Sequence, residues 1–323
     1  MYNRPEEIKE LLDSFLEMKL PRNYEIVIIE DGSSISSEEV VQTFSEQLNI
    51  SYYIKENTGP GDSRNFGMKK AQGNYFIILD SDCILPQDYM ANVIKSLDES
   101  YVDCFGGPDA AHESFSNLQK AIDFSMTSFI TTGGIRGNKH SVDKFQPRSF
   151  NMGLSKDAFE ASKGFANIHP GEDPDLSIRL KKLGYKTKLV PEAFVYHKRR
   201  ISWSKFYKQV NKFGMTRPIL NSWYPKTRKL TYWFPTIFSL TFIVAIAVFI
   251  LGHMLPIVVF GIYFGLAFMI ALSKNNLSVA LMVIPAIILQ FFGYGWGFLR
   301  STFMLALSRK SPEQLFPHLF FEI

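Results

Sequence analysis

The stretch Tyr75–Asp82, which reads Tyr-Phe-Ile-Ile-Leu-Asp-Ser-Asp, joins a short apolar run to two carboxylates. Five consecutive apolar residues are typical of a strand buried on both faces of a parallel sheet. Asp80 and Asp82 are separated by one residue, so in extended backbone both can reach one hard cation, and Mg²⁺ and Mn²⁺ prefer oxygen ligands. Asp is also common in turns, so the meaning of Asp80-Ser81-Asp82 depends on the residues around it.

Apolar runs and amphipathic patterns alternate on both sides of this stretch. We predict strands at Glu25–Ile29, Ile50–Ile54, Tyr75–Leu79, Val102–Phe105 and Lys188–Tyr196. We predict helices from Pro5 to Leu16, Ser36–Leu48, Gly61–Gln72, Pro86–Leu97, Leu118–Phe129 and Asp173–Leu183. Strands and helices that alternate at this spacing favour an α/β domain with a mainly parallel sheet.

Charge divides the chain into two different parts. Up to His197 there are 21 basic and 29 acidic residues, a charge of −8, and beyond it 14 basic and 2 acidic residues, a charge of +12. Lys198–Lys229 mixes basic and aromatic residues, which is compatible with nucleic acid. The apolar segments that follow favour an anionic membrane surface instead, so we expect contact with membrane lipids and none with nucleic acid.

Three apolar segments follow the basic stretch: Tyr232–Leu251, Leu255–Leu272 and Val279–Leu299. Each is about long enough to cross a hydrocarbon core of ~30 Å. Three simple crossings would place Lys274 and the cations near Arg300 on opposite sides, against the usual bias of positive charge toward the cytosol. Either one segment is re-entrant or the last stretch adds a further crossing, so we predict three or four membrane helices.

The compartment of the first part follows from two observations. Cys83 and Cys104 are the only cysteines, too few for a disulfide scaffold and suited to a reducing compartment. The N-terminus has no apolar signal core. We therefore expect a cytoplasmic head on a multi-pass protein of the cell membrane.

Further polar residues follow the predicted strands, where open α/β sheets bind ligands. Asp31, followed by Gly32 and Ser33, ends the strand at Glu25–Ile29. Asn57 and Gly59 lie in a glycine-rich turn into the helix that carries Arg64. Amides at a helix N-terminus together with a guanidinium suit an anionic ligand, although a plain turn and helix cap is also compatible with this pattern.

Two adjacent acids begin a later helix. Glu172 and Asp173 follow Gly171 at the start of the predicted helix that contains Asp175 and Arg179. A carboxylate at a helix N-terminus is commonly only a cap. The alternative is that one of the pair serves as a general base toward a hydroxyl.

In this order and spacing the motifs resemble the family 2 glycosyltransferases of GT-A fold. They are Tyr2-Asn3-Arg4, Glu30-Asp31-Gly32-Ser33, Asn57-x-Gly59 with Arg64-Asn65-x-Gly67, Asp80-Ser81-Asp82, Gly171-Glu172-Asp173 and Tyr196-His197. The resemblance covers nearly all of residues 1–200. It implies an inverting, metal-dependent enzyme that takes its sugar from a nucleotide-diphosphate sugar.

The resemblance also implies a role for each matching residue. Asp31, Gly32, Ser33, Asn57, Gly59, Arg64, Asp80 and Ser81 would bind the nucleotide-sugar. Asp80, Asp82 and His197 would hold Mg²⁺ or Mn²⁺ under the diphosphate. Asp173, with Glu172 beside it, would deprotonate the acceptor hydroxyl, and Asn151 and Arg136 would lie on the acceptor side.

The chain departs from the family pattern at two places. The Gln-x-x-Arg-Trp motif of processive synthases is absent, since the nearby stretch is Tyr207-Lys208-Gln209-Val210-Asn211; this favours transfer of one sugar or few. Relatives also carry an apolar strand that ends in Pro-x-Tyr-Asn, and here Met1 stands in the place of x. We therefore expect the native chain to begin earlier.

The sequence thus predicts a GT-A domain at 1–200, a membrane-interface segment at 201–231, transmembrane helices within 232–310 and a tail at 311–323. The expected reaction is inverting sugar transfer to a hydroxyl of a lipid-linked or membrane-proximal acceptor in cell-surface glycan synthesis. One alternative is a non-catalytic, nucleotide-sugar-binding component of an envelope-assembly complex. Another is a nucleotidyltransferase, but the glycine-rich loop expected after its first strand is missing.

Overall fold

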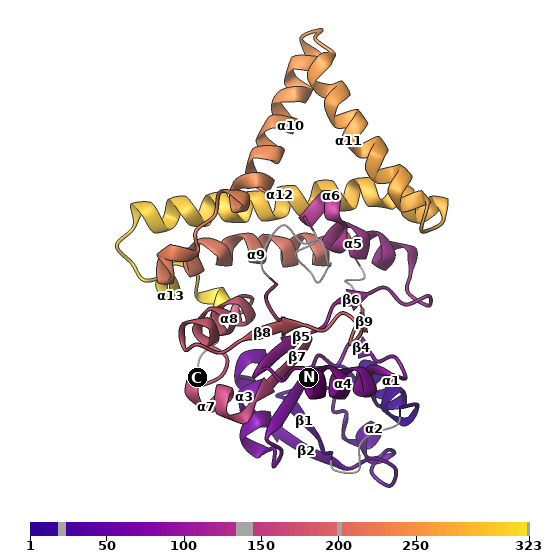
Figure 1. The fold of residues 1–323 in the computed structure, drawn as a ribbon. Coiled ribbons are helices and arrows are strands. Elements are labelled where there is room, and N and C mark those ends of the chain that lie inside the picture. Colours follow the sequence, from indigo (N-terminus) through magenta and orange to yellow (C-terminus); the bar gives the residue numbers. More distant parts are fainter. Residues whose placement is uncertain (19–23, 134–144, 199–201, 322–323) are drawn as a thin grey trace. The chain divides into compact units, whose positions relative to one another are not determined.

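The computed structural model describes residues 1–18, 24–133, 145–198 and 202–321, which fall into two compact units. The first unit comprises the described residues of 1–112, 134–198 and 320–323, and the second those of 113–133 and 199–319. Figure 1 labels the helices and strands of both units.

The first unit holds the alternating helices and strands that the sequence predicts. Its helices are α1 (Pro5–Leu16), α2 (Glu38–Gln42), α3 (Pro60–Lys70), α4 (Tyr89–Glu99), α7 (Lys156–Ser162) and α8 (Glu172–Lys182). Its strands are β1 (Ile26–Asp31), β2 (Ile50–Lys55), β3 (Tyr75–Leu79), β4 (Cys83–Ile84), β5 (Cys104–Gly106), β6 (Asp109–Ala110), β7 (Asn151–Ser155), β8 (Thr187–Leu189) and β9 (Val195–His197).

The sheets of this unit are mixed, which refines the expectation of a mainly parallel sheet. The pairs β1–β2, β5–β8 and β6–β9 are parallel, whereas β7 runs antiparallel to both β3 and β5, and β4 antiparallel to β9. Strand β7 escaped prediction because Asn151-Met152-Gly153-Leu154-Ser155 lacks a β-branched run. The pairing of β7 with β5 requires glycine at position 153, because a Cβ there would lie 2.0 Å from the ring of Phe105.

Met1, the first residue of the chain, forms backbone hydrogen bonds with the edge of β1. The terminal amine of Met1 donates to the carbonyl of Ile29 at 2.6 Å, and the amide of Asp31 donates to the carbonyl of Met1 at 2.8 Å. The two contacts follow the spacing of a parallel ladder, so Met1 lies along β1 on the edge opposite β2. That a further strand precedes Met1 stays a prediction.

Two apolar clusters stabilise the first unit. One includes Leu12 of α1, Ile28 of β1 and Tyr89 of α4, and the other includes Met68 of α3, Leu154 of β7 and Leu176 of α8. Burial of such side chains contributes roughly 1.5–3 kcal/mol each. The helices are therefore fixed against the sheets, and this fixes the strand ends on which the acidic residues lie.

Helix and strand limits differ from the predicted ones mainly in the short elements. The helix predicted at Ser36–Leu48 is only Glu38–Gln42 followed by turns, and the strand predicted at Lys188–Tyr196 is two strands, β8 and β9, around a turn. Pro191 explains the second difference, because proline lacks the amide that a continuing ladder needs.

The second unit is helical. It contains α5 (Asn117–Thr127), α6 (Phe129–Thr132), α9 (Trp203–Trp223), α10 (Phe234–Ile250), α11 (Leu255–Leu272), α12 (Leu277–Leu307) and α13 (Pro312–Leu315), with short 3₁₀ turns at Pro225–Thr227, Leu230–Trp233 and Pro317–Leu319. Three stretches, Leu230–Ile250, Leu255–Leu272 and Leu277–Leu307, are long and apolar enough to cross a membrane. This confirms the predicted apolar helices, and the last is longer than expected because it continues to Leu307.

Candidate active site

The loop after β1 is organised by the carboxylate of Asp31. Its Oδ1 accepts from the amide of Thr58 at 3.0 Å and from Lys55 Nζ at 2.7 Å, and its Oδ2 accepts from the amide of Gly59 at 3.0 Å. Asp31 is 5% exposed. Asp31 therefore fixes the turn that leads into α3, and Lys55 balances its charge.

The two glycines of this region are required by their backbone. Gly32 has φ +68°, and a Cβ there would lie 2.6 Å from the amide nitrogen of Asn57. Gly59 has φ +92° and lies against the ring of Phe321. Only glycine adopts such φ values without steric cost, so the predicted glycine-rich turn has a structural reason. Ser33 fixes the other side of the loop, since its Oγ accepts from the amide of Asn3 at 2.8 Å.

Arg64 of α3 joins two of the predicted acidic residues. Its Nη2 donates to Asp80 Oδ1 at 2.7 Å, at the end of β3, and its Nη1 donates to Glu172 Oε1 at 3.1 Å, at the start of α8. Its guanidinium also lies over the ring of Phe165, 5.4 Å from the centroid. Burial acts to lower the pKa of Arg64, but the neighbouring carboxylates, Asp80 first, outweigh it and raise that pKa.

The pKa values of Glu172 and Asp173 are displaced in opposite directions. Burial opposes ionisation of Glu172, but His169 and Arg64 overcome it and hold its pKa below the usual range; His169 Nδ1 lies 2.9 Å from Glu172 Oε1. Burial, and then the charge of Glu172, raise the pKa of Asp173. Among the described residues, no group donates a hydrogen bond to the buried Oδ1 of Asp173. Neighbouring acids displaced in this way are suited to different roles.

A second acidic group lies on the sheet β4–β9–β6. His197 Nε2 is 3.2 Å from Asp82 Oδ1, and His197 Nδ1 is 3.8 Å from Asp109 Oδ2. The imidazole stacks on Phe150, with 4.7 Å between centroids, and Arg4 Nη1 donates to Asp82 Oδ2 at 3.1 Å. Strand pairing brings Asp82, His197 and Asp109 together, because Cys83 pairs with His197 and Asp109 with Val195.

Within the described part of the chain, Asp82, Cys83 and His197 bring possible ligand atoms within 4.8 Å of one another. Burial raises the pKa of the Cys83 thiol well above its usual value, and a neutral thiol is a poor metal ligand. Asp82 and His197 remain as possible ligands, and the carboxylate of Asp82 suits Mg²⁺ or Mn²⁺. Asp80 lies outside this group and is paired with Arg64.

The structure describes one of the two predicted acceptor-side residues, Asn151. Asn151 is fully buried, where its Oδ1 accepts from Tyr89 Oη at 2.7 Å and its Nδ2 donates to the carbonyl of Ala193 at 2.8 Å. This burial argues against contact with an acceptor and makes Asn151 a scaffold residue. Arg136 lies outside the described residues.

Among the described residues, four ionisable side chains that pair with predicted site residues were not predicted: Lys55, Asp109, His169 and, as a partner of Asp82, Arg4. Each acts on a predicted residue through a contact between distant segments or across a loop. A local signal existed only for His169, three residues before Glu172. The remaining contacts depend on strand pairing, which the sequence does not state.

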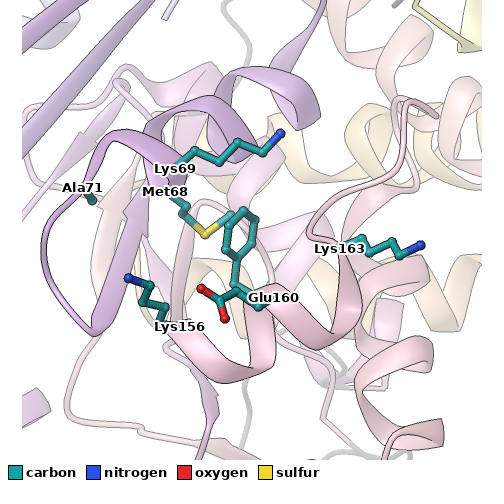
Figure 2. A pocket seen from close by; sticks show the side chains of 7 residues that line it. Met68, Lys69, Ala71, Lys156, Glu160 and Lys163 are labelled. Carbon is teal, nitrogen blue, oxygen red and sulfur yellow. The ribbon is translucent and has the colours of Figure 1, made fainter.

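A separate pocket lies between the end of α3 and α7. It is lined by Met68, Lys69, Ala71, Lys156, Phe159, Glu160 and Lys163, and Figure 2 shows the Glu160 carboxylate between the lysines. It shares no residue with the two acidic groups described above. Its rim consists of exposed lysines, as on an ordinary solvated surface.

Comparison with known proteins identifies the first part of the chain. Residues 1–160 match the model of the glycosyl transferase family 2. The chain carries a family 2 glycosyltransferase domain. The match covers β1 to β7, with Asp31, Arg64 and both carboxylates of Asp80-Ser81-Asp82.

Relatives of this family 2 domain belong to larger proteins. It is 36% identical over 104 residues to the glycosyltransferase GlyA of Streptococcus pneumoniae, across 32% of this chain and 15% of GlyA. It is 28% identical over 219 residues to the poly-beta-1,6-N-acetyl-D-glucosamine synthase of Staphylococcus aureus, across 63% of this chain and 52% of the synthase. The chain thus spans about half, or much less, of these relatives.

A solved structure has the same fold. The mannosyltransferase PcManGT of Pyrobaculum calidifontis, solved with GDP-Man and Mn²⁺, superposes with a TM-score of 0.56 at 16% identity, across 90% of this chain and 85% of that one. At this identity the likeness concerns the fold alone. The predicted GT-A fold of the family 2 domain is therefore confirmed.

Proposed function

We propose that the chain transfers a sugar from a nucleotide-diphosphate sugar to a hydroxyl of a lipid-linked or membrane-proximal acceptor, with inversion, in the synthesis of a cell-surface glycan. The observation that carries this proposal is the pair Glu172 and Asp173 at the start of α8. Arg64 joins this pair to Asp80 at the end of β3. The candidate base and the Asp80 carboxylate expected beside the diphosphate are therefore linked through Arg64, at the carboxyl end of β3.

Asp173 is the base in this proposal. Its raised pKa makes the ionised carboxylate a better proton acceptor than an ordinary Asp, and a general base works best with a pKa close to the working pH. Asp173 removes the proton of the acceptor hydroxyl while that oxygen attacks the anomeric carbon from the side opposite the diphosphate. The bond from that carbon to the diphosphate oxygen breaks, and the diphosphate leaves with the electron pair.

The remaining residues bind and orient. Arg64 carries the positive charge that a diphosphate needs, and Asp31 with Gly59 shapes the turn proposed to hold the nucleoside. Asp82 and His197 would hold Mg²⁺ or Mn²⁺, which neutralises charge on the leaving diphosphate. Asp109 on the far side of the imidazole supports this assignment, because metal-ligating histidines usually have such a carboxylate partner.

The experiment is nucleotide-sugar turnover by the full chain in detergent micelles. Radiolabelled UDP- and GDP-sugars are supplied with Mn²⁺ or Mg²⁺, and release of the nucleoside diphosphate is measured with and without EDTA. We expect metal-dependent release for wild type and for the exposed-acid control Asp98→Asn, and at least a hundredfold less for Asp173→Asn, since general base catalysis contributes about 10²–10⁴-fold. Binding of a nucleotide-sugar without any turnover would favour the non-catalytic alternative.

A further inference from the structure

The helix α12, one of the three apolar candidates for a membrane span, is packed along its length by two helices that carry charges. Its first half contacts α5, since Ala121 and Phe124 share a cluster with Val279 and Val283.

The second half of α12 contacts α9, where Asn211 Nδ2 donates to the carbonyl of Gly293 at 2.9 Å and Ser301 Oγ donates to the carbonyl of Met215 at 2.7 Å. Figure 1 shows α9 and α12 side by side.

The approach of α9 to α12 is close over several turns. A Cβ on Gly214 would lie 2.1 Å from the carbonyl oxygen of Tyr294, and one on Gly297 would lie 2.3 Å from the carbonyl oxygen of Asn211. The contacts advance together along both helices, from 211 and 293 to 215 and 301, so the two helices run parallel and pack along one another.

Helix α9 is unsuited to the hydrocarbon core. Its Lys205, Lys208 and Lys212 fall on one stripe, away from the α12 contact, and the first two are exposed. A Lys at the centre of a bilayer costs roughly 2.5–3.5 kcal/mol even on the lenient insertion scale. Such a helix lies in the interface, with its cations toward anionic headgroups, and α12, which packs along it, then also lies parallel to the membrane plane.

The other side of α12 receives both ends of a helical hairpin. Thr236 Oγ1, in the first turn of α10, donates to the carbonyl of Gly295 at 3.0 Å. Ala267 and Ala271, in the last turns of α11, pack in one cluster with Val279 and its neighbours on α12. Figure 1 shows α10 and α11 rising from α12 and meeting at their tip. Their 17 and 18 residues correspond to about 26 Å each at 1.5 Å per residue.

We infer that only α10 and α11 cross the membrane, as a hairpin that returns to its side of entry, while α12 lies in the interface beside α9. Leu281, Trp296, Phe303 and Leu307 are more than half exposed on the α12 stripe that does not face α9, and they would contact acyl chains. In this topology Lys274, Arg300, Arg309 and Lys310 all lie on one side, as the positive-inside bias requires. Neither a re-entrant segment nor a further crossing is needed.

Cysteine accessibility tests this topology independently of any transferase activity. Cys83 and Cys104 are buried, so the wild-type chain is the background, and His253→Cys at the hairpin tip, Ser273→Cys after α11 and Arg309→Cys after α12 each add one exposed thiol. A membrane-impermeant maleimide is applied to intact and to permeabilised cells. We expect positions 273 and 309 to react under the same condition, and position 253 to react from the opposite side.

Two results would overturn the inference. If position 309 reacts from the side of position 253 and not from that of position 273, then α12 crosses the membrane. If all three positions react from one side, then the hairpin does not cross. Folding of each variant is checked by size exclusion in detergent, and Lys274→Cys, exposed in the turn between α11 and α12, repeats the assignment of the 273 side at a second position.

Discussion

The imidazole of His197 lies between two carboxylates from different strands: its Nε2 is 3.2 Å from Asp82 Oδ1 and its Nδ1 is 3.8 Å from Asp109 Oδ2. Asp109 is buried, with a fully enclosed side chain, and at 3.8 Å its negative charge acts on the Nδ1 side of the imidazole. Second partners of this kind orient a histidine toward a metal and increase its basicity.

Asp109→Asn should therefore weaken Mn²⁺ binding by about 10–100-fold, the usual effect of removing a second partner. Free Mn²⁺ is measured by electron paramagnetic resonance during titration of the full chain, so that no turnover is needed. Asp82→Asn should weaken binding further, because it removes a ligand, and Asp98→Asn should leave it unchanged. Equal affinity in Asp109→Asn and wild type would mean that Asp109 has no effect on the site.

Glu172→Gln should shift the pH profile of nucleotide-sugar turnover to the acid side. Burial and the charge of Glu172 raise the pKa of Asp173, so removal of that charge lowers it, and Asp173 stays ionised at lower pH. The acid limb of log kcat/KM against pH is compared among wild type, Glu172→Gln and the exposed control Glu160→Gln. An acid limb that is unchanged in Glu172→Gln would argue against Asp173 as the group that titrates.

Arg64→Ala should destabilise the family 2 domain by about 3 kcal/mol, because it leaves the buried Glu172 without its guanidinium partner. Arg64→Lys should lose less, since a single ammonium can still pair with one of the two carboxylates. The apparent Tm in detergent is measured for both variants and for Lys69→Ala on the exposed face of the same helix. Equal melting of Arg64→Ala and Lys69→Ala would show that the buried pairs contribute little.

Gly32→Ala should lower stability as well as turnover. At φ +68° an alanine is strained by about 1–2 kcal/mol, and its Cβ would meet the backbone of Asn57 at 2.6 Å. Gly184→Ala is the matched control, because Gly184 has φ +89° but open space around it. The excess loss of apparent Tm in Gly32→Ala over Gly184→Ala reports the contact with Asn57.

The sequence located most of the structured elements because their signals are local. The apolar runs at Glu25–Ile29 and Tyr75–Leu79 became β1 and β3, and the three uncharged stretches became α10, α11 and α12. Strand β7 and the short strands β4 and β6 were not predicted, since their pairing depends on partners far along the chain. The reversal of β7, and with it the mixed sheet, had no local signal.

The sequence by itself determined the acidic residues at strand ends, the glycine-rich turn and the apolar second part, because composition and spacing are local properties. Only the tertiary structure decided how the carboxylates are divided: Asp80 and Glu172 pair with Arg64, whereas Asp82 lies beside His197 and Asp109. It also decided that the apolar helix α12 packs along the lysine-bearing helix α9. Both results depend on contacts between residues far apart in the chain, which follow from packing and strand register.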